Sequence, residues 1–124
     1  MARRTYIFAG PAESAGILEA VIEAALGRPV VREPGTEPYV RADPIVVYLG
    51  RHEFDDGDMD APDGRPLALQ TSYPLLADIR DVDRDAGRQQ VAAARILAAI
   101  KADGRLIAVL IDDMQHVLDV GNSG

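Results

Sequence analysis

The sequence predicts an α+β or α/β fold in which a single mixed β-sheet of about four to six strands is covered by two α-helices. Three observations predict this fold. The chain has 124 residues, the usual size of one domain. Apolar residues recur at helical spacing in two stretches, and uninterrupted apolar runs of strand length occur in the middle and near the end. We therefore expect residues 1–124 to form a single domain.

The first two expected elements are a strand and a helix. Residues 5–9 are mostly β-branched or aromatic, which predicts a strand that ends at Gly10. Pro11 suits the first turn of a helix, and the apolar residues of 17–26 recur every three or four positions. Gly27 then ends this helix.

Prolines separate that helix from the next strand. Residues 30–44 contain three prolines, so we expect a loop with at most a short edge strand at residues 39–41. Residues 45–49 read Ile-Val-Val-Tyr-Leu, an uninterrupted apolar run. Such a run predicts a strand that is covered on both faces and lies centrally in the sheet.

The middle of the chain combines an acidic loop with further strands. Residues 52–66 mix carboxylates with glycine and proline, which predicts a surface loop. Residues 67–70 are expected to form a short strand and residues 73–82 a longer one. Alternation along the longer strand divides its side chains into two faces: Leu75, Ala77 and Ile79 on one, Leu76, Asp78 and Arg80 on the other.

The second helix has the clearest signals. Asp83 or Asp85 would cap its N-terminus, and Gly104 follows its end. Residues 106–111 then predict a buried strand, and residues 117–120 a last short element of either type. The helix has an apolar face of Ala93, Ile96, Leu97 and Ile100, and an opposite basic face of Arg84, Arg88 and Arg95. The basic face would hold an anion, neutralise the acidic loop or simply face solvent.

Composition excludes several classes of function. The chain has no cysteine, which removes disulfides, thiolate metal sites and cysteine nucleophiles and fits a cytoplasmic protein. No apolar stretch reaches the roughly 18 residues of a membrane helix. The net charge of −7 disfavours nucleic acid as a partner, because phosphate binding depends on displaced counterions. A basic protein is the expected partner.

The acidic loop is the first candidate site. Its carboxylates would steer a basic partner, while two apolar side chains between them would supply contact energy. The expected partner-binding residues are Glu53, Phe54, Asp55, Asp56, Asp58, Met59, Asp60 and Asp63.

The alternative interpretations of this loop are a plainly solvated surface loop and a calcium site. Asp56, Asp58 and Asp60 have the first three spacings of an EF-hand loop. Ala61 stands where the turn glycine belongs, and Leu67 where the bidentate glutamate belongs. We therefore predict no metal and no cofactor here.

A second candidate site is the group Asp112, Asp113 and His116 after the last buried strand. In a helical turn, Asp112 and His116 would share one face, as two metal ligands do. The alternative is an aspartate that caps the next turn beside an exposed histidine. We predict no catalytic residue, because the turn around Ser14 lacks the Lys and Ser or Thr of a phosphate loop and a complete triad is missing.

Residues 73–111 contain Tyr73-Pro74-Leu75-Leu76, a polar turn, an alanine-rich helix that ends at Lys101-Ala102-Asp103-Gly104, and a buried strand. In outline this third of the chain resembles the C-terminal half of barstar-type nuclease inhibitors. The family's Tyr-Gly-x-Asn-Leu-Asp turn is absent, so no inhibitory residue is carried over. More broadly, the chain is similar to small, acidic, cysteine-free bacterial toxin-immunity proteins, and this implies a cytoplasmic binding protein without chemistry of its own.

We therefore expect an immunity-type protein that binds and inhibits a cognate basic toxin. The alternative is a small regulatory or metabolite-sensing domain with a ligand near Asp112 and Asp113. An enzyme would require His116 to lie within hydrogen-bond reach of a carboxylate in a cleft.

Overall fold

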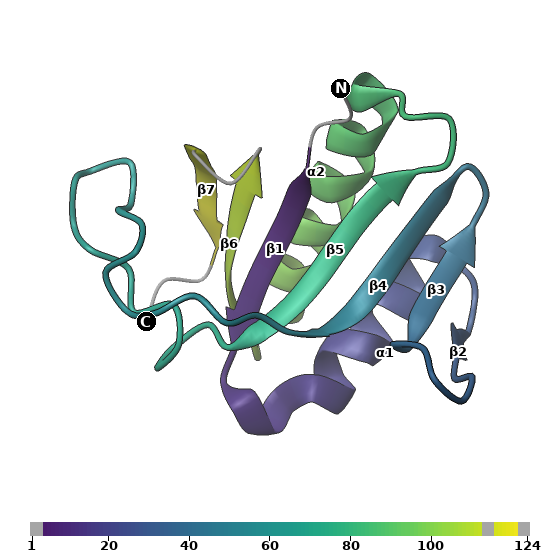
Figure 1. The fold of residues 1–124 in the computed structure, drawn as a ribbon, viewed down its shortest axis with the longest axis horizontal. Helices are drawn as coiled ribbons and strands as arrows, with labels where there is room; N and C mark the ends of the chain where they lie inside the picture. The colour runs from purple at the N-terminus through teal and green to yellow at the C-terminus, as the bar shows by residue number, and fades with distance from the viewer. Residues whose placement is uncertain (1–3, 113–115, 122–124) are drawn as a thin grey trace.

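The computed structural model describes residues 4–112 and 116–121. It confirms the predicted fold class: one β-sheet with two α-helices packed on one of its faces (Figure 1). Within the described residues the sheet has seven strands, in the order β2-β3-β4-β5-β1-β6-β7. The strands are β1 (Thr5–Gly10), β2 (Val30–Val31), β3 (Tyr39–Ala42), β4 (Ile45–Arg51), β5 (Leu75–Asp81), β6 (Ile107–Asp112) and β7 (His116–Gly121). The helices are the short 3-10 turn η1 (Ala12–Ser14), α1 (Ala15–Leu26) and α2 (Ala86–Asp103).

All neighbouring strands of the sheet are antiparallel. The parallel relationship expected of a strand-helix-strand unit exists between β5 and β6, which α2 connects, but these two strands are not neighbours. β1 lies between them and pairs antiparallel with both. The strand β1 is thus inserted into the β5-α2-β6 unit, which the second half of the chain forms.

The main hydrophobic core lies between the sheet and the helices. The strand β5 contributes Leu75, Ala77 and Ile79, as its alternation predicts. The helix α2 contributes the predicted apolar face, including Ile96 and Ile100, which are both 0% exposed. Binary patterning therefore decides which face of each element points inward.

Local end signals also place the second helix. Asp85 caps it, because its Oδ1 accepts a hydrogen bond from the Arg88 backbone N–H at 3.1 Å. Gly104 ends it with φ of 80°, a left-handed conformation in which glycine has no Cβ to clash. The last element, predicted at residues 117–120 without a type, is the strand β7.

The short strand predicted at residues 67–70 does not form, and this prediction was wrong. The chain turns there instead, with backbone hydrogen bonds from Ser72 to Ala68 and from Tyr73 to Leu69. Leu67 and Leu69 are nevertheless buried. These two leucines are apolar because they pack a loop against the sheet, and not because they belong to a strand.

That packing creates a second hydrophobic cluster on the face of the sheet opposite the helices. The sheet contributes Phe8, Val109 and Ile111, and the chain between β4 and β5 contributes Leu67, Leu69 and Tyr73. In Figure 1 this connection crosses in front of β5 and β1 and extends to the left of the sheet. The rest of this face, over β3, β4 and part of β5, has no described segment in front of it and is called the open face below.

Candidate binding surface

The acidic loop, residues 52–66, is fixed to the sheet by its own apolar side chains. Phe54 and Met59 are half-buried and pack against the second hydrophobic cluster. The sequence suggests that both project toward a partner, but much of each side chain contacts the protein itself. The physical reason is that Phe8 and its neighbours would otherwise leave an apolar face of the sheet in water.

One carboxylate of the acidic loop, Asp56, fastens the loop to the segment that follows it. Asp56 accepts hydrogen bonds from the backbone N–H groups of Gln70 at 2.8 Å and Thr71 at 2.9 Å, and from the Thr71 hydroxyl. The bond from the Thr71 hydroxyl contributes most to lowering the pKa of Asp56 below its ordinary value. Asp56 therefore fastens the acidic loop to residues 70–71, which follow it, and this limits what Asp56 can offer to a partner.

Two further carboxylates are engaged within the loop. Asp58 accepts a hydrogen bond from the Asp55 backbone N–H at 2.8 Å. Asp63 accepts from the backbone N–H of Arg65 and pairs with its side-chain Nε at 2.7 Å. The backbone bond is the largest cause of the lowered pKa of Asp63. These contacts fix the shape of the loop and neutralise part of its charge.

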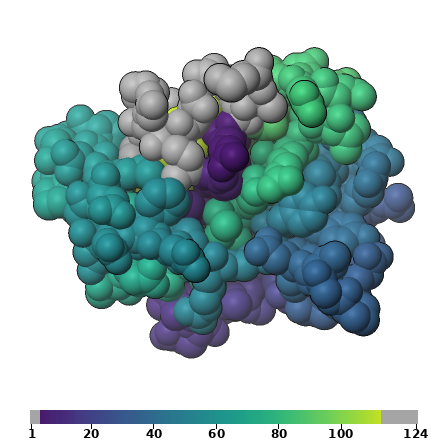
Figure 2. Space-filling model, in the orientation of Figure 1, coloured from purple at the N-terminus to yellow at the C-terminus, as the bar shows by residue number. Residues whose placement is uncertain are grey.

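The remaining carboxylates face solvent. Glu53, Asp55 and Asp60 are exposed, and their side chains form no hydrogen bond or ion pair with any described residue. Figure 2 shows the acidic loop as a lobe at the left of the molecule. The loop thus presents three uncommitted negative charges on a backbone that is held in place.

The calcium alternative gains no geometric support in the part of the chain that is described. There, no three His, Cys, Asp or Glu side chains gather closely enough to hold a metal ion. Asp56, the first expected ligand, is already bound to Thr71 and Gln70.

An aromatic hollow lies where the acidic loop leaves the sheet, and no local sequence pattern indicates it. It has a volume of about 340 Å³ and is lined by Tyr6, Phe8, His52, Glu53, Phe54 and Leu76. His52 is 7% exposed, and its ring stacks on that of Phe8 with centroids 3.9 Å apart. The two rings come from segments far apart in the sequence, so local patterns carry no signal for their contact.

A row of tyrosines extends from the open face to this hollow. Tyr39, Tyr48 and Tyr6 lie on β3, β4 and β1, and strand register brings Tyr48 and Tyr6 to either side of Asp78 on β5. Arg80 pairs with Asp78 at 2.7 Å and lies over the Tyr48 ring, 4.8 Å from its centroid. Tyrosine and arginine are enriched where proteins bind one another.

The second candidate site has a different geometry from the one expected. Asp112 is buried at the end of β6, and His116 begins β7, so the two residues are register partners across a hairpin. Because each residue belongs to one of two paired antiparallel strands, they are not the i and i+4 positions of one helical turn. Gln90 Nε2 contacts Asp112 Oδ2 at 3.4 Å. Asp113 lies outside the described residues.

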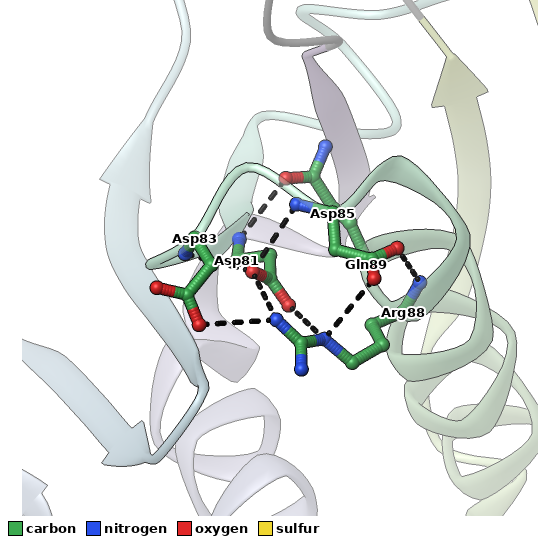
Figure 3. Close-up of polar contacts among 5 residues, drawn as sticks. All are labelled: Asp81, Asp83, Asp85, Arg88 and Gln89. Carbon is green, nitrogen blue, oxygen red and sulfur yellow. Dashed lines mark hydrogen bonds and ion pairs between the residues drawn. The ribbon is translucent and has the colours of Figure 1, made fainter.

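The basic side chains expected along the second helix do not form one surface. Arg84 precedes the helix and has φ of 60°. Arg95 donates to the Ala25 carbonyl at 3.1 Å. Arg88 folds back onto Asp81, 2.8 Å from its Nε, and onto Asp83 (Figure 3). The helix therefore neutralises the turn that precedes it. Within residues 4–112 and 116–121, no hydrogen bond or ion pair joins these arginines to the acidic loop.

Comparison of the chain with protein-family models, curated proteins and solved structures gave no match. In the described ranges neither helix is both long and apolar enough to cross a membrane. The fold and the surface together describe a small α+β protein with an acidic loop and an open sheet face.

Proposed function

We propose that this protein is an immunity-type inhibitor, which binds a cognate basic toxin and covers its active cleft with carboxylates while performing no chemistry of its own. The observation that carries the proposal is the set of three uncommitted carboxylates, Glu53, Asp55 and Asp60, on a loop fixed to the sheet.

The fixed loop favours binding for an entropic reason. A flexible acidic segment loses backbone conformational freedom when a partner orders it, at a cost of roughly 1–2 kcal/mol per residue. Here Asp56 and the second hydrophobic cluster impose the loop conformation before any partner arrives. The carboxylates are therefore presented without that additional ordering of the backbone.

The charge distribution favours a basic partner. The net charge of −7 attracts a cationic protein over long range, and the acidic loop concentrates that field at one end of the molecule. Such complementarity mainly raises the association rate constant.

The test uses the protein encoded immediately upstream of this gene, provided as its purified C-terminal domain. We expect that domain to be basic and toxic in a bacterial growth assay, and coexpression of this chain to restore growth. Association is measured by stopped-flow fluorescence at low and high salt. A domain that does not bind at micromolar concentration, or whose toxicity is unchanged by bound inhibitor, would contradict the proposal.

Matched variants locate the interaction. The triple variant Glu53→Gln, Asp55→Asn, Asp60→Asn should slow association about tenfold at low salt, because it removes steering charge. The control variant Glu13→Gln, Glu19→Gln, Glu23→Gln removes the same charge from η1 and α1, on the helix side of the sheet. Equal slowing by both variants would assign the effect to net charge alone and would remove the acidic loop from the interface.

A further inference from the structure

We infer that the aromatic hollow receives one arginine side chain of the basic partner, with the Glu53 carboxylate at its rim pairing with the guanidinium. This inference rests on the proposed function for the identity of the partner, but the site itself is defined by geometry.

The floor of the hollow is rigid and uncharged. Phe8 is 0% exposed, and His52 stacks against it. His52 Nδ1 accepts a hydrogen bond from the Phe54 backbone N–H at 3.1 Å, so that nitrogen carries no proton. Its Nε2 therefore holds the proton and donates to the Tyr73 carbonyl at 2.6 Å. Both ring nitrogens are engaged, and because Phe8 and His52 are buried, the accessible aromatic surface of the hollow comes from Tyr6 and Phe54.

The walls of the hollow are also aromatic. Phe54 and Tyr6 lie with ring centroids 5.7 Å and 6.0 Å from that of Phe8, and Leu76 completes the lining. A volume of about 340 Å³ is at the lower end of the range of small-ligand pockets. The hollow therefore fits one inserted side chain better than a large metabolite.

The negative charge at the hollow indicates that the inserted side chain of the partner is a cation. Glu53 is the only lining residue with a formal charge, and its carboxylate has no ion-pair partner among the described residues. Arg51, the nearest arginine in the sequence, lines a different hollow. Asp55 lies two residues further along the acidic loop and adds negative charge. Aromatic faces attract cations, and a neighbouring carboxylate strengthens that preference.

Arginine fits this site better than lysine. Its guanidinium is planar and weakly hydrated, so it stacks on a ring while it pairs with a carboxylate through two N–H groups. A lysine ammonium has a compact and strongly held hydration shell, which an enclosed aromatic site removes at greater cost.

The experiment is an NMR titration of the ¹⁵N-labelled chain with acetyl-tetraarginine amide, compared with acetyl-tetralysine amide. We expect the largest shift changes at the backbone amides of Tyr6, Glu53, Phe54 and Leu76, with tighter binding of the arginine peptide. Glu53→Gln and Phe54→Leu should each lower the affinity for the arginine peptide about two- to fivefold, since each removes one part of a cation site. Glu13→Gln, a charge change on the other side of the sheet, should leave the affinity unchanged.

The choice of variants keeps the result interpretable. Glu53 is exposed, so Glu53→Gln does not disturb the fold, while Phe54→Leu keeps apolar contact with Phe8 and removes only the ring. Undiminished dispersion of the NMR spectrum would show that each variant is folded.

The inference and the proposed function fail in different ways. Shift changes confined to Asp55, Asp58 and Asp60 would overturn the arginine site and leave the acidic loop as the binding surface. An absence of shift changes at millimolar peptide would also overturn the arginine site. Equal affinity for both peptides, with no effect of Phe54→Leu, would reduce the site to simple charge attraction and also overturn it. Binding in the hollow without inhibition of the upstream toxin would contradict the proposed function and retain the arginine site.

Discussion

Arg88 forms an ion pair with Asp81 across the turn that joins β5 to α2, with Arg88 Nε 2.8 Å from Asp81 Oδ2. The Asp81 side chain is 0% exposed, and its Oδ1 also accepts the backbone N–H groups of Asp83 and Asp85. Gln89 ties the same turn to β1, because it accepts from the Asp81 backbone N–H and donates to the Thr5 hydroxyl at 2.9 Å. Figure 3 shows how one carboxylate organises the turn.

The first prediction concerns pH and Asp81. The Arg88 hydrogen bond lowers the pKa of Asp81 below 3.8, so the charged carboxylate stabilises the fold above that pH. This contribution is lost as the pH falls through the lowered pKa of the folded state. Asp81→Asn should therefore reduce the free energy of unfolding at pH 7, and the difference from wild type should shrink at an acidic pH well below the ordinary pKa of aspartate.

Urea denaturation at both pH values measures this difference. Asp83→Asn, which changes a side chain that is 73% exposed, is the control and should have little effect at either pH. A destabilisation by Asp81→Asn that is the same at both pH values would show that the hydrogen bonds of Asp81, and not its charge, stabilise the turn.

The second prediction concerns closure of the acidic loop. Asp56→Ala removes the acceptor of three hydrogen bonds from Gln70 and Thr71. We expect faster hydrogen exchange at the amides of these two residues and faster proteolysis within residues 52–66, because the loop opens locally. Asp55→Ala removes an uncommitted carboxylate of the same loop and should change neither rate. Unchanged exchange at Thr71 in Asp56→Ala would contradict the anchoring role.

The third prediction contrasts two glycines. A Cβ at Gly10 would lie 1.9 Å from the Ser72 carbonyl oxygen, so Gly10→Ala forces the backbone at Ser72 away from β1. We expect a loss of about 1–3 kcal/mol in the free energy of unfolding, the range for overpacking. Gly16 lies in α1 with nothing within 4 Å of such a Cβ, so Gly16→Ala should stabilise by about 0.5 kcal/mol. Two effects of the same sign in urea denaturation would refute this contrast.

The fourth prediction concerns the main core. Ile96 on α2 is 0% exposed, and Ile96→Ala should cost about 2–5 kcal/mol through lost burial and the cavity that remains. Val91 on the same helix is 67% exposed, so Val91→Ala should stay within about 0.5 kcal/mol of wild type. Thermal denaturation followed by circular dichroism separates the two variants. A small effect of Ile96→Ala would mean that the core repacks around it.

Local patterns predicted much of the fold. The helix end at Gly104 and the inward face of β5 depend on a few neighbouring residues and are predicted correctly, while the cap is predicted at Asp83 or Asp85 and lies at Asp85. Residues 67–70 were assigned wrongly because an apolar run looks the same in a strand and in a loop that packs on a sheet. The antiparallel insertion of β1 depends on pairing between distant segments, which periodicity does not encode.

The candidate site was predictable only in part. Charge clustering indicated the acidic loop, but which carboxylates are committed depends on Thr71 and Arg65, and that requires the folded geometry. The hollow depends on the stacking of Phe8 with His52, which only strand order brings about. Its rim residue Glu53 belonged to the expected surface, whereas Tyr6 and Leu76 did not.

The position of β1 between β5 and β6 has a consequence for biosynthesis. The strand β1 is apolar and is translated before both of its neighbours in the sheet, β5 and β6. Residues 5–10 therefore have no native strand partner until β5 has emerged, and they lack the second partner until residue 112 has emerged. The nascent chain completes the pairing on both sides of β1, and with it the support beneath the acidic loop, only after β6 has been translated.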